Sequence, residues 1–293
     1  MSLTDFIKLL RPNQWYKNLL VFLAIFFSGN FLNLESLYLV FLGFISLIAI
    51  SSANYIINDI VDIRKDRSHP EKSLRPLASG KVKIWQAVII GIALIAVSLF
   101  IASNLHPYFL YSVLFLFGFT QLYSFFLKKE AFADVIAISI NFIVRASAGA
   151  FIINVLISPW LILVVFFLAL FLTLGKRKSD LVYLGENASE HKPSLKNYSK
   201  EIIDFLMIIS TSALVITYSL YCTLGKNPLM LFTLPIAIYA LFRYISLVYS
   251  GSEIGRQPHK VFKDLRMVIA IILWIAVSAA VLYSSVTLSH LLP

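Results

Sequence analysis

The chain has 293 residues, of which 59% are hydrophobic and only 14% are charged, and its mean hydropathy is +0.83. A soluble domain of this length would not bury so much apolar surface, so the composition excludes a soluble protein and predicts an all-α, polytopic membrane protein. The net charge of +10 could suit nucleic acid, but in a membrane protein the distribution of charge matters more than the sum.

Nine apolar runs are long enough to cross a bilayer. They cover residues 16–31, 36–57, 84–103, 108–127, 132–153, 159–176, 203–223, 229–249 and 267–290. We therefore predict about nine transmembrane helices in a single integral-membrane domain over residues 1–293. Charges and Pro12 precede the first run, so we do not expect a cleavable signal peptide. The single cysteine, Cys222, excludes an intramolecular disulfide framework and a cysteine-based metal site.

The basic residues are distributed unevenly among the loops. With a cytosolic N-terminus, all but three of the 25 lysines and arginines fall in the N-terminal segment and in the loops that follow even-numbered spans. The exceptions are Arg145 and Arg243, inside spans, and Lys226 on the opposite side. Positive charge favours the cytosolic side, so we predict chemistry at the cytosolic face of the cell membrane. This bias accounts for the net charge, and no nucleic-acid partner is expected.

The first span is preceded by L-R-P-N-Q-W-Y-K-N at residues 10–18. Pro12 suits the first turn of a short interfacial helix, and Trp15 and Tyr16 suit the headgroup region. These residues could be an ordinary amphipathic anchor. Alternatively, Lys17 and Asn18 could face inward, toward the charged segment 58–80.

That charged segment, N-D-I-V-D-I-R-K-D-R-S-H-P-E-K-S-L-R-P-L-A-S-G, contains a regular set of carboxylates. Asp59, Asp62 and Asp66 are spaced i, i+3 and i+7, so one helix would place all three on one face after Asn58. Such carboxylates repel one another unless a cation lies among them, and Mg²⁺ takes one or two carboxylates together with phosphate oxygens. Basic residues able to pair with phosphates follow at Arg64, Lys65, Arg67, Lys72 and Arg75. A merely solvated loop would not explain this spacing.

Two later boundaries between spans and loops also contain candidate residues. In 121–135, Tyr123 ends a span, Lys128 lies in the turn and Asp134 opens the next span, where the helix N-terminus favours a carboxylate. Snorkelling alone could explain the lysine. Lys176 and Arg177 begin a basic cluster after the sixth run, which could equally be a positive-inside stop signal.

Arg145 lies near the middle of the fifth run. A guanidinium at that depth is costly unless it meets a carboxylate, a phosphate or water. The small residues that follow it allow close helix packing and direct the side chain into the bundle. An ion pair between Arg145 and Asp134 is disfavoured, because eleven residues along a helix separate them. We therefore favour a functional role for Arg145 over a structural ion pair.

With these features in view, the chain resembles the UbiA superfamily of intramembrane prenyltransferases over essentially its whole length. The most specific element is N-D-x-x-D-x-x-x-D at 58–66. Within the superfamily it looks most like the polyprenyl-phosphate phosphoribosyltransferases. That closer resemblance is carried by R-P-x-Q-W-x-K-N at 11–18, D-R-x-H-P-x-K-x-x-R-P at 66–76, Y-S-x-x-L-K at 123–128 and R-A-x-A-G at 145–149.

The resemblance implies a glycosyltransferase-type enzyme. It would move the 5-phosphoribosyl group from 5-phosphoribosyl diphosphate to a polyprenyl phosphate of the decaprenyl type, with a cell-wall precursor as product. It implies Mg²⁺ on Asp59, Asp62 and Asp66, which are also the catalytic residues. The substrate-binding residues that we expect are Lys17, Asn58, Arg67, Lys72, Arg75, Tyr123, Lys128, Asp134, Arg145, Lys176 and Arg177. The sequence does not specify an oligomeric state.

One difference from the aromatic prenyltransferases of this superfamily favours phosphoribosyl transfer. Aromatic prenyltransferases of this superfamily usually have a second D-x-x-x-D motif after helix six, whereas here Lys176-Arg177-Lys178-Ser179-Asp180 is followed by no second aspartate in register. A mostly basic patch suits a bare phosphate better than a metal-bridged diphosphate. The alternatives are prenyl transfer from prenyl diphosphate to an aromatic or lipid acceptor, an anion transporter using Arg145, and a structural scaffold. Clustering of charge at one face disfavours the transporter, and the scaffold leaves the aspartates unexplained.

Overall fold

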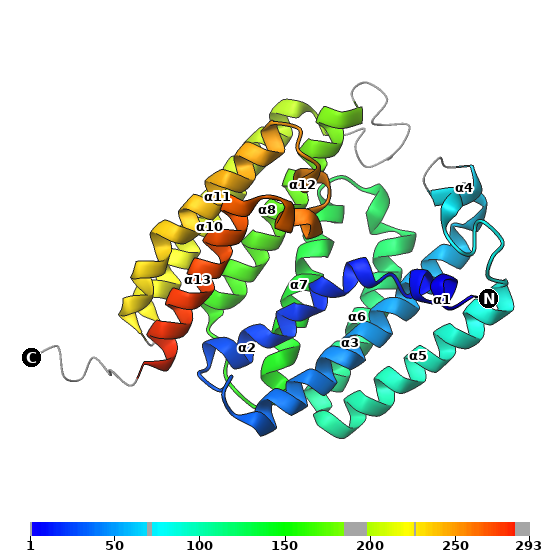
Figure 1. Cartoon of the computed structure of the whole chain (residues 1–293), viewed down its shortest axis with the longest axis horizontal. Coiled ribbons are helices and arrows are strands. Elements are labelled where there is room, and N and C mark those ends of the chain that lie inside the picture. The colour runs from blue at the N-terminus through cyan, green and yellow to red at the C-terminus, as the bar shows by residue number, and fades with distance from the viewer. Residues whose placement is uncertain (1, 69–71, 185–197, 226, 285–293) are drawn as a thin grey trace, which may run out of the picture. The chain divides into compact units, whose positions relative to one another are not determined.

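The computed structural model describes residues 2–68, 72–184, 198–225 and 227–284, and every regular element in these ranges is helical (Figure 1). The chain divides into two compact units. Unit 1 comprises Met1–Ile25, Asn30–Leu127 and Val144–Val155, and unit 2 comprises Phe26–Gly29, Lys128–Ile143 and Leu156–Pro293. The all-α membrane fold is confirmed, and the single-domain assignment stays a prediction.

Eight of the described helical segments are long and apolar enough to cross a membrane. They are Leu34–Val61, Ile84–Leu105, Pro107–Phe125, Ala133–Ile152, Pro159–Val182, Lys200–Leu224, Pro228–Tyr249 and Leu265–Tyr283. They match the second to ninth predicted runs. The predicted number of about nine is therefore close, and the difference lies in the first run.

The first run is not a uniform α-helix. Pro12–Val21 form a ten-residue 3₁₀ helix, η1, and only Phe22–Phe27 form an α-helix, α2. Contacts with other parts of the chain hold this segment in place. Trp15 Nε1 donates a hydrogen bond to Ser52 Oγ at 3.3 Å, and the Asn18 side chain is buried. A 3₁₀ helix rises about 2.0 Å per residue, compared with about 1.5 Å for an α-helix, so η1 reaches further per residue.

Unit 1 is organised around the long helix α3. Its described elements are α1 (Leu3–Leu10), η1, α3 (Leu34–Val61), α4 (Ile63–Arg67), η2 (Lys72–Leu74), α5 (Ile84–Leu105), α6 (Pro107–Phe125) and the second half of α7 (Ala133–Ile152). Helix α3 begins where the Asn33 side chain accepts a hydrogen bond from Ser36 N. It packs on α5 through Ser46 and Ser98, whose hydroxyl oxygens lie 2.9 Å apart and within 3.0 Å of each other's backbone carbonyl oxygens. The two hydroxyl protons can make two of these three hydrogen bonds at a time. Small buried side chains let these two helices approach closely.

Unit 2 contains the first half of α7 and most of the C-terminal helices. Its other described elements are η3 (Leu127–Lys129), α8 (Pro159–Leu184), α10 (Lys200–Leu224), η6 (Pro228–Thr233), α11 (Leu234–Tyr249), α12 (Glu253–Arg256), η7 (Pro258–Lys263) and α13 (Leu265–Tyr283). The first residue of η3, Leu127, belongs to unit 1. Ser199 caps α10 and Asp264 caps α13 with side-chain oxygens. An apolar cluster that includes Val135, Phe171 and Ile203 forms a core of this unit.

One close backbone approach in unit 1 requires glycine. A Cβ atom at Gly149 would lie 1.9 Å from the carbonyl oxygen of Val21, so α7 and η1 would have to separate. We expect Gly149→Ala to lower the free energy of unfolding by about 1–3 kcal/mol. Thermal unfolding in detergent would measure this. Gly118→Ala on α6 is the matched control, because its Cβ would meet nothing within 4 Å and alanine is the better helix former. Equal stability of the two variants would contradict the contact.

Candidate active site

The acidic motif lies where α3 ends. Asp59 is in the last turn of α3, Asp62 is the junction residue, and Asp66 lies on α4. Backbone bonds from Asp62 N to Asn58 O (2.9 Å) and from Asp66 N to Asp62 O (2.8 Å) continue the helical pattern across the junction. Helical hydrogen bonds thus continue from Asn58 to Asp66, although the helix is interrupted at Asp62. Asp59 and Asp66 are each only 3% exposed, and Asp62 and Asn58 are half-buried.

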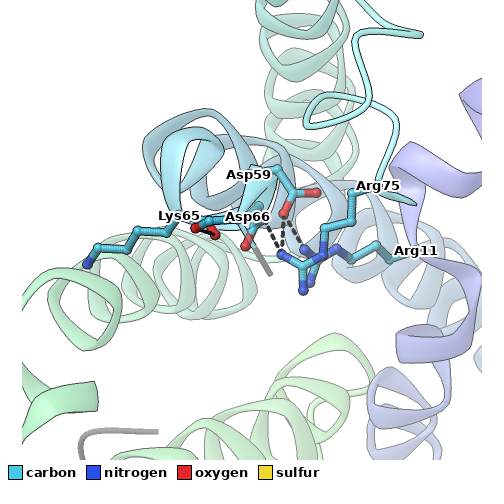
Figure 2. Close-up of polar contacts among 6 residues, drawn as sticks. Arg11, Asp59, Lys65, Asp66 and Arg75 are labelled. Atoms are coloured by element: carbon cyan, nitrogen blue, oxygen red, sulfur yellow. Dashed lines mark hydrogen bonds and ion pairs between the residues drawn. The ribbon is translucent and has the colours of Figure 1, made fainter. Parts of the chain in front are cut away.

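Two arginines converge on these carboxylates. Arg75 Nη1 donates to Asp59 Oδ1 at 3.0 Å and to Asp66 Oδ2 at 2.6 Å, and Arg11 Nη2 also bonds to Asp59 Oδ1 (Figure 2). The Arg11 guanidinium lies 5.0 Å from the centre of the Tyr55 ring, a cation–π contact. Figure 2 shows Lys65 extending away from this group. Two buried carboxylates, those of Asp59 and Asp66, thus pair with the same guanidinium group, that of Arg75.

The loop that carries Arg75 is held in place by its own contacts. Leu77 and Val82 are buried against Leu9 and Ile56. Arg67 is exposed, and its Nε donates to the carbonyl of Ala78 at 3.3 Å, which ties α4 to the loop. We infer that Arg67 positions the loop.

The carboxylates fit a divalent cation in part. Within the described ranges, no group of three His, Cys, Asp or Glu side chains is arranged to hold a metal ion. Oxygens of Asp59 and Asp66 nevertheless lie within 3.0 Å of one guanidinium nitrogen, so both can face a single positive centre. Mg²⁺ usually takes only one or two carboxylates and completes its shell with water and phosphate oxygens. Asp59 and Asp66 therefore suit Mg²⁺, and a place for Asp62 among the ligands stays a prediction.

Arg145 lies deeper in unit 1, on α7. Its Nε donates to Asn18 Oδ1 at 2.9 Å and its Nη2 lies 3.5 Å from Ser51 Oγ. Arg145 is 8% exposed and Asn18 is 1% exposed. Asn18 is thus buried in unit 1, where its side-chain oxygen is bonded to Arg145 and Ser51 and not to a residue of segment 58–80. Lys17 is half-buried, 6.0 Å from the Tyr16 ring.

In unit 2, two predicted substrate ligands bind each other. Arg177 Nε and Nη2 donate to Asp134 Oδ2 at 3.0 and 2.6 Å, and Tyr198 OH donates to Asp134 Oδ1 at 2.9 Å. Burial and the nearby Asp134 carboxylate raise the pKa of Tyr198 above its ordinary value, which keeps its hydroxyl a donor. The adjacent Lys178 pairs with Asp204 at 2.7 Å. This arrangement ties α7, α8 and the segment before α10 together.

The remaining predicted ligands are less buried. Lys72 on η2, Tyr123 on α6 and Lys128 on η3 are half-buried, and Lys176 on α8 is exposed. The structure thus gathers Asp59, Asp66 and Arg75 into one contact group.

The sequence patterns indicate no individual role for Arg11, Tyr55, Ser51 or Tyr198. Arg11 begins the R-P-x-Q-W-x-K-N motif, so the resemblance did contain a signal for it. Its backbone has φ of +53°, in the left-handed region between α1 and η1, which turns the chain sharply there. Tyr198 is separated from Asp134 by 64 residues, and no local pattern links the two.

The chain is thus a multi-pass, all-α membrane protein with an aspartate motif at a helix end and arginines beside it, side chains that suit a divalent cation and phosphate oxygens. The UbiA prenyltransferase family is matched over residues 19–270, and the chain belongs to this family. It is thus an enzyme, a transferase.

Relatives agree with this assignment, and a solved structure agrees with the fold. The chain is 31% identical to decaprenyl-phosphate phosphoribosyltransferase of Mycolicibacterium smegmatis, over 95% of this chain and 92% of that protein. It is 29% identical to the protein of the same name in Mycobacterium tuberculosis, over 94% of each chain. A UbiA homolog from Archaeoglobus fulgidus, solved with GPP and Mg²⁺, has the same fold with a TM-score of 0.74. It is 22% identical, and the match covers 96% of this chain and all of that one.

Proposed function

We propose that this enzyme transfers the 5-phosphoribosyl group from 5-phosphoribosyl diphosphate to a polyprenyl phosphate of the decaprenyl type, with release of diphosphate. The names of relatives at about 30% identity over most of the chain support this reaction. The observation that carries the proposal is the meeting of Asp59 and Asp66 with Arg75 and Arg11. It combines carboxylates for a divalent cation with guanidinium groups for phosphate oxygens.

The proposed mechanism assigns separate tasks to these residues. Mg²⁺ on Asp59 and Asp66, with Asp62 as a further candidate, would neutralise charge that builds on the leaving diphosphate. Arg75 and Arg11 would bind phosphate oxygens of the donor. The acceptor phosphate is already an anion, so it needs no strong general base and only has to be held in line with C1 of the ribose.

Other predicted substrate-binding residues are retained in this proposal as positioning residues. They are Lys17, Asn58, Arg67, Lys72, Tyr123 and Arg145 in unit 1, and Lys128, Asp134, Lys176 and Arg177 in unit 2. Asp134 and Arg177 already satisfy each other, so either would have to exchange partners to bind substrate. The basic bias of alternate loops supports a plasma-membrane enzyme with its site facing the cytoplasm.

Radiolabel transfer tests this function. Membranes containing the protein would receive labelled 5-phosphoribosyl diphosphate, Mg²⁺ and a polyprenyl monophosphate, with EDTA as the control. We expect label to enter the lipid phase only when metal is present. The prenyltransferase alternative would replace this proposal if no label entered the lipid phase and the membranes prenylated an aromatic acid from prenyl diphosphate. The GPP bound to the A. fulgidus protein favours that alternative.

A further inference from the structure

The contacts around Asn18 leave one buried donor unsatisfied. The Asn18 side-chain oxygen accepts from Arg145 Nε at 2.9 Å and from Ser51 Oγ at 3.3 Å. Because the Arg145 Nε–H can only donate, the amide oxygen of Asn18 faces it and the amide nitrogen points away. That nitrogen, Nδ2, is buried and has no hydrogen-bond partner. A buried unsatisfied donor costs about 1–3 kcal/mol, so such groups are rare unless a ligand or water completes them.

The surroundings of this donor favour an anion. Asn18, Ser51 and Arg145 are 1%, 7% and 8% exposed, so the guanidinium charge is held in a poorly solvated place. Asn18 and Ser51, which accept hydrogen bonds from Arg145, are both neutral side chains. An amide N–H, a hydroxyl and a guanidinium together form a donor-rich group, and guanidinium forks match phosphate oxygens well.

The position of the group separates it from the carboxylates. Ser51 precedes Asp59 by eight residues on α3, which corresponds to about 12 Å of helix rise. We assign a ligand at Arg145 to a phosphate other than the diphosphate assigned to Asp59 and Asp66. In the proposed reaction two such groups exist, the 5-phosphate of the donor and the phosphate of the lipid acceptor, and both are phosphate monoesters.

We propose that Asn18, Ser51 and Arg145 form a buried subsite in unit 1 that binds a phosphate monoester. The inference rests on the proposed function for the choice of phosphate over other anions. Within the subsite, Arg145 supplies charge, the Asn18 amide N–H donates to a phosphate oxygen, and Ser51 helps to orient Asn18.

The test measures binding by isothermal titration calorimetry on the full chain in detergent, with ribose 5-phosphate and farnesyl monophosphate as probes. Asn18→Asp places a carboxylate beside Arg145 and removes the unsatisfied N–H, so it should keep or raise the thermal midpoint while weakening binding at least about tenfold. Arg145→Gln should weaken binding similarly. Ser98→Ala is the control for destabilisation alone, because Ser98 is buried in the contact of α3 with α5. It should lower the thermal midpoint without changing either affinity.

Weaker binding of ribose 5-phosphate alone would assign the subsite to the donor, and weaker binding of farnesyl monophosphate alone would assign it to the acceptor. Either result, or both, supports the subsite. Unchanged affinities in both variants, or no binding of either probe to the wild type, would overturn it. Variant-sensitive binding without phosphoribosyl transfer would reject the proposed function and keep the subsite, whereas transfer with insensitive binding would do the reverse.

Discussion

Asp59→Asn should reduce phosphoribosyl transfer by at least about 100-fold at saturating Mg²⁺, with the protein still folded in detergent. Asp59 is the carboxylate on which both Arg11 and Arg75 converge. The amide keeps the shape of the side chain but loses the negative charge that a divalent cation needs. Asp62→Asn should have a comparable effect, because the motif predicts Asp62 as a further ligand. Initial rates over a range of Mg²⁺ concentrations would measure both losses.

Glu35→Gln is the matched control for this experiment. It makes the same chemical change on the same helix, in the exposed first turn of α3. This variant should retain wild-type rates. Near-normal turnover of Asp59→Asn at every Mg²⁺ concentration would reject the assignment of Asp59 as a metal ligand.

Asp134→Asn should lower the free energy of unfolding by about 3–5 kcal/mol, because it leaves the Arg177 charge buried without its partner. The Asp134 and Arg177 side chains are only 1% and 5% exposed, so solvent cannot compensate. Denaturant titration in mixed micelles would measure the loss. The double variant Asp134→Leu/Arg177→Met should recover most of the stability, since apolar side chains of similar size remove both charges.

The same variants distinguish a structural pair from a substrate site. If Arg177 mainly binds a substrate phosphate, Arg177→Met should raise KM while stability changes little, and that result would contradict the structural assignment. Glu253→Gln provides a surface comparison in unit 2. Glu253 pairs with Lys260 and Lys263 in an exposed position, so the stability of this variant should stay close to that of the wild type.

Much of the architecture could be predicted from the sequence. Apolar runs of bilayer length report directly on membrane-spanning helices, since no other backbone arrangement satisfies its hydrogen bonds within one segment. Asp59 and Asp66 were placed on one face by the helical period alone, which is a local property. The family, too, was apparent from short motifs. The first run was different, because its 3₁₀ geometry accompanies hydrogen bonds to residues far along the chain, such as that of Trp15 with Ser52.

The sequence by itself determined the class of protein, the helical spans and the acidic motif, because each depends on composition or on spacing within one helix. Only the tertiary structure decided which charges meet. Arg11 is 48 residues from Asp59, Asp134 is 43 from Arg177, and Asn18 is 127 from Arg145. Any of the 25 basic residues could in principle have served Asp59 or Asp134. Partner choice follows from how the helices pack, and packing is a sum over many side chains that no single motif records.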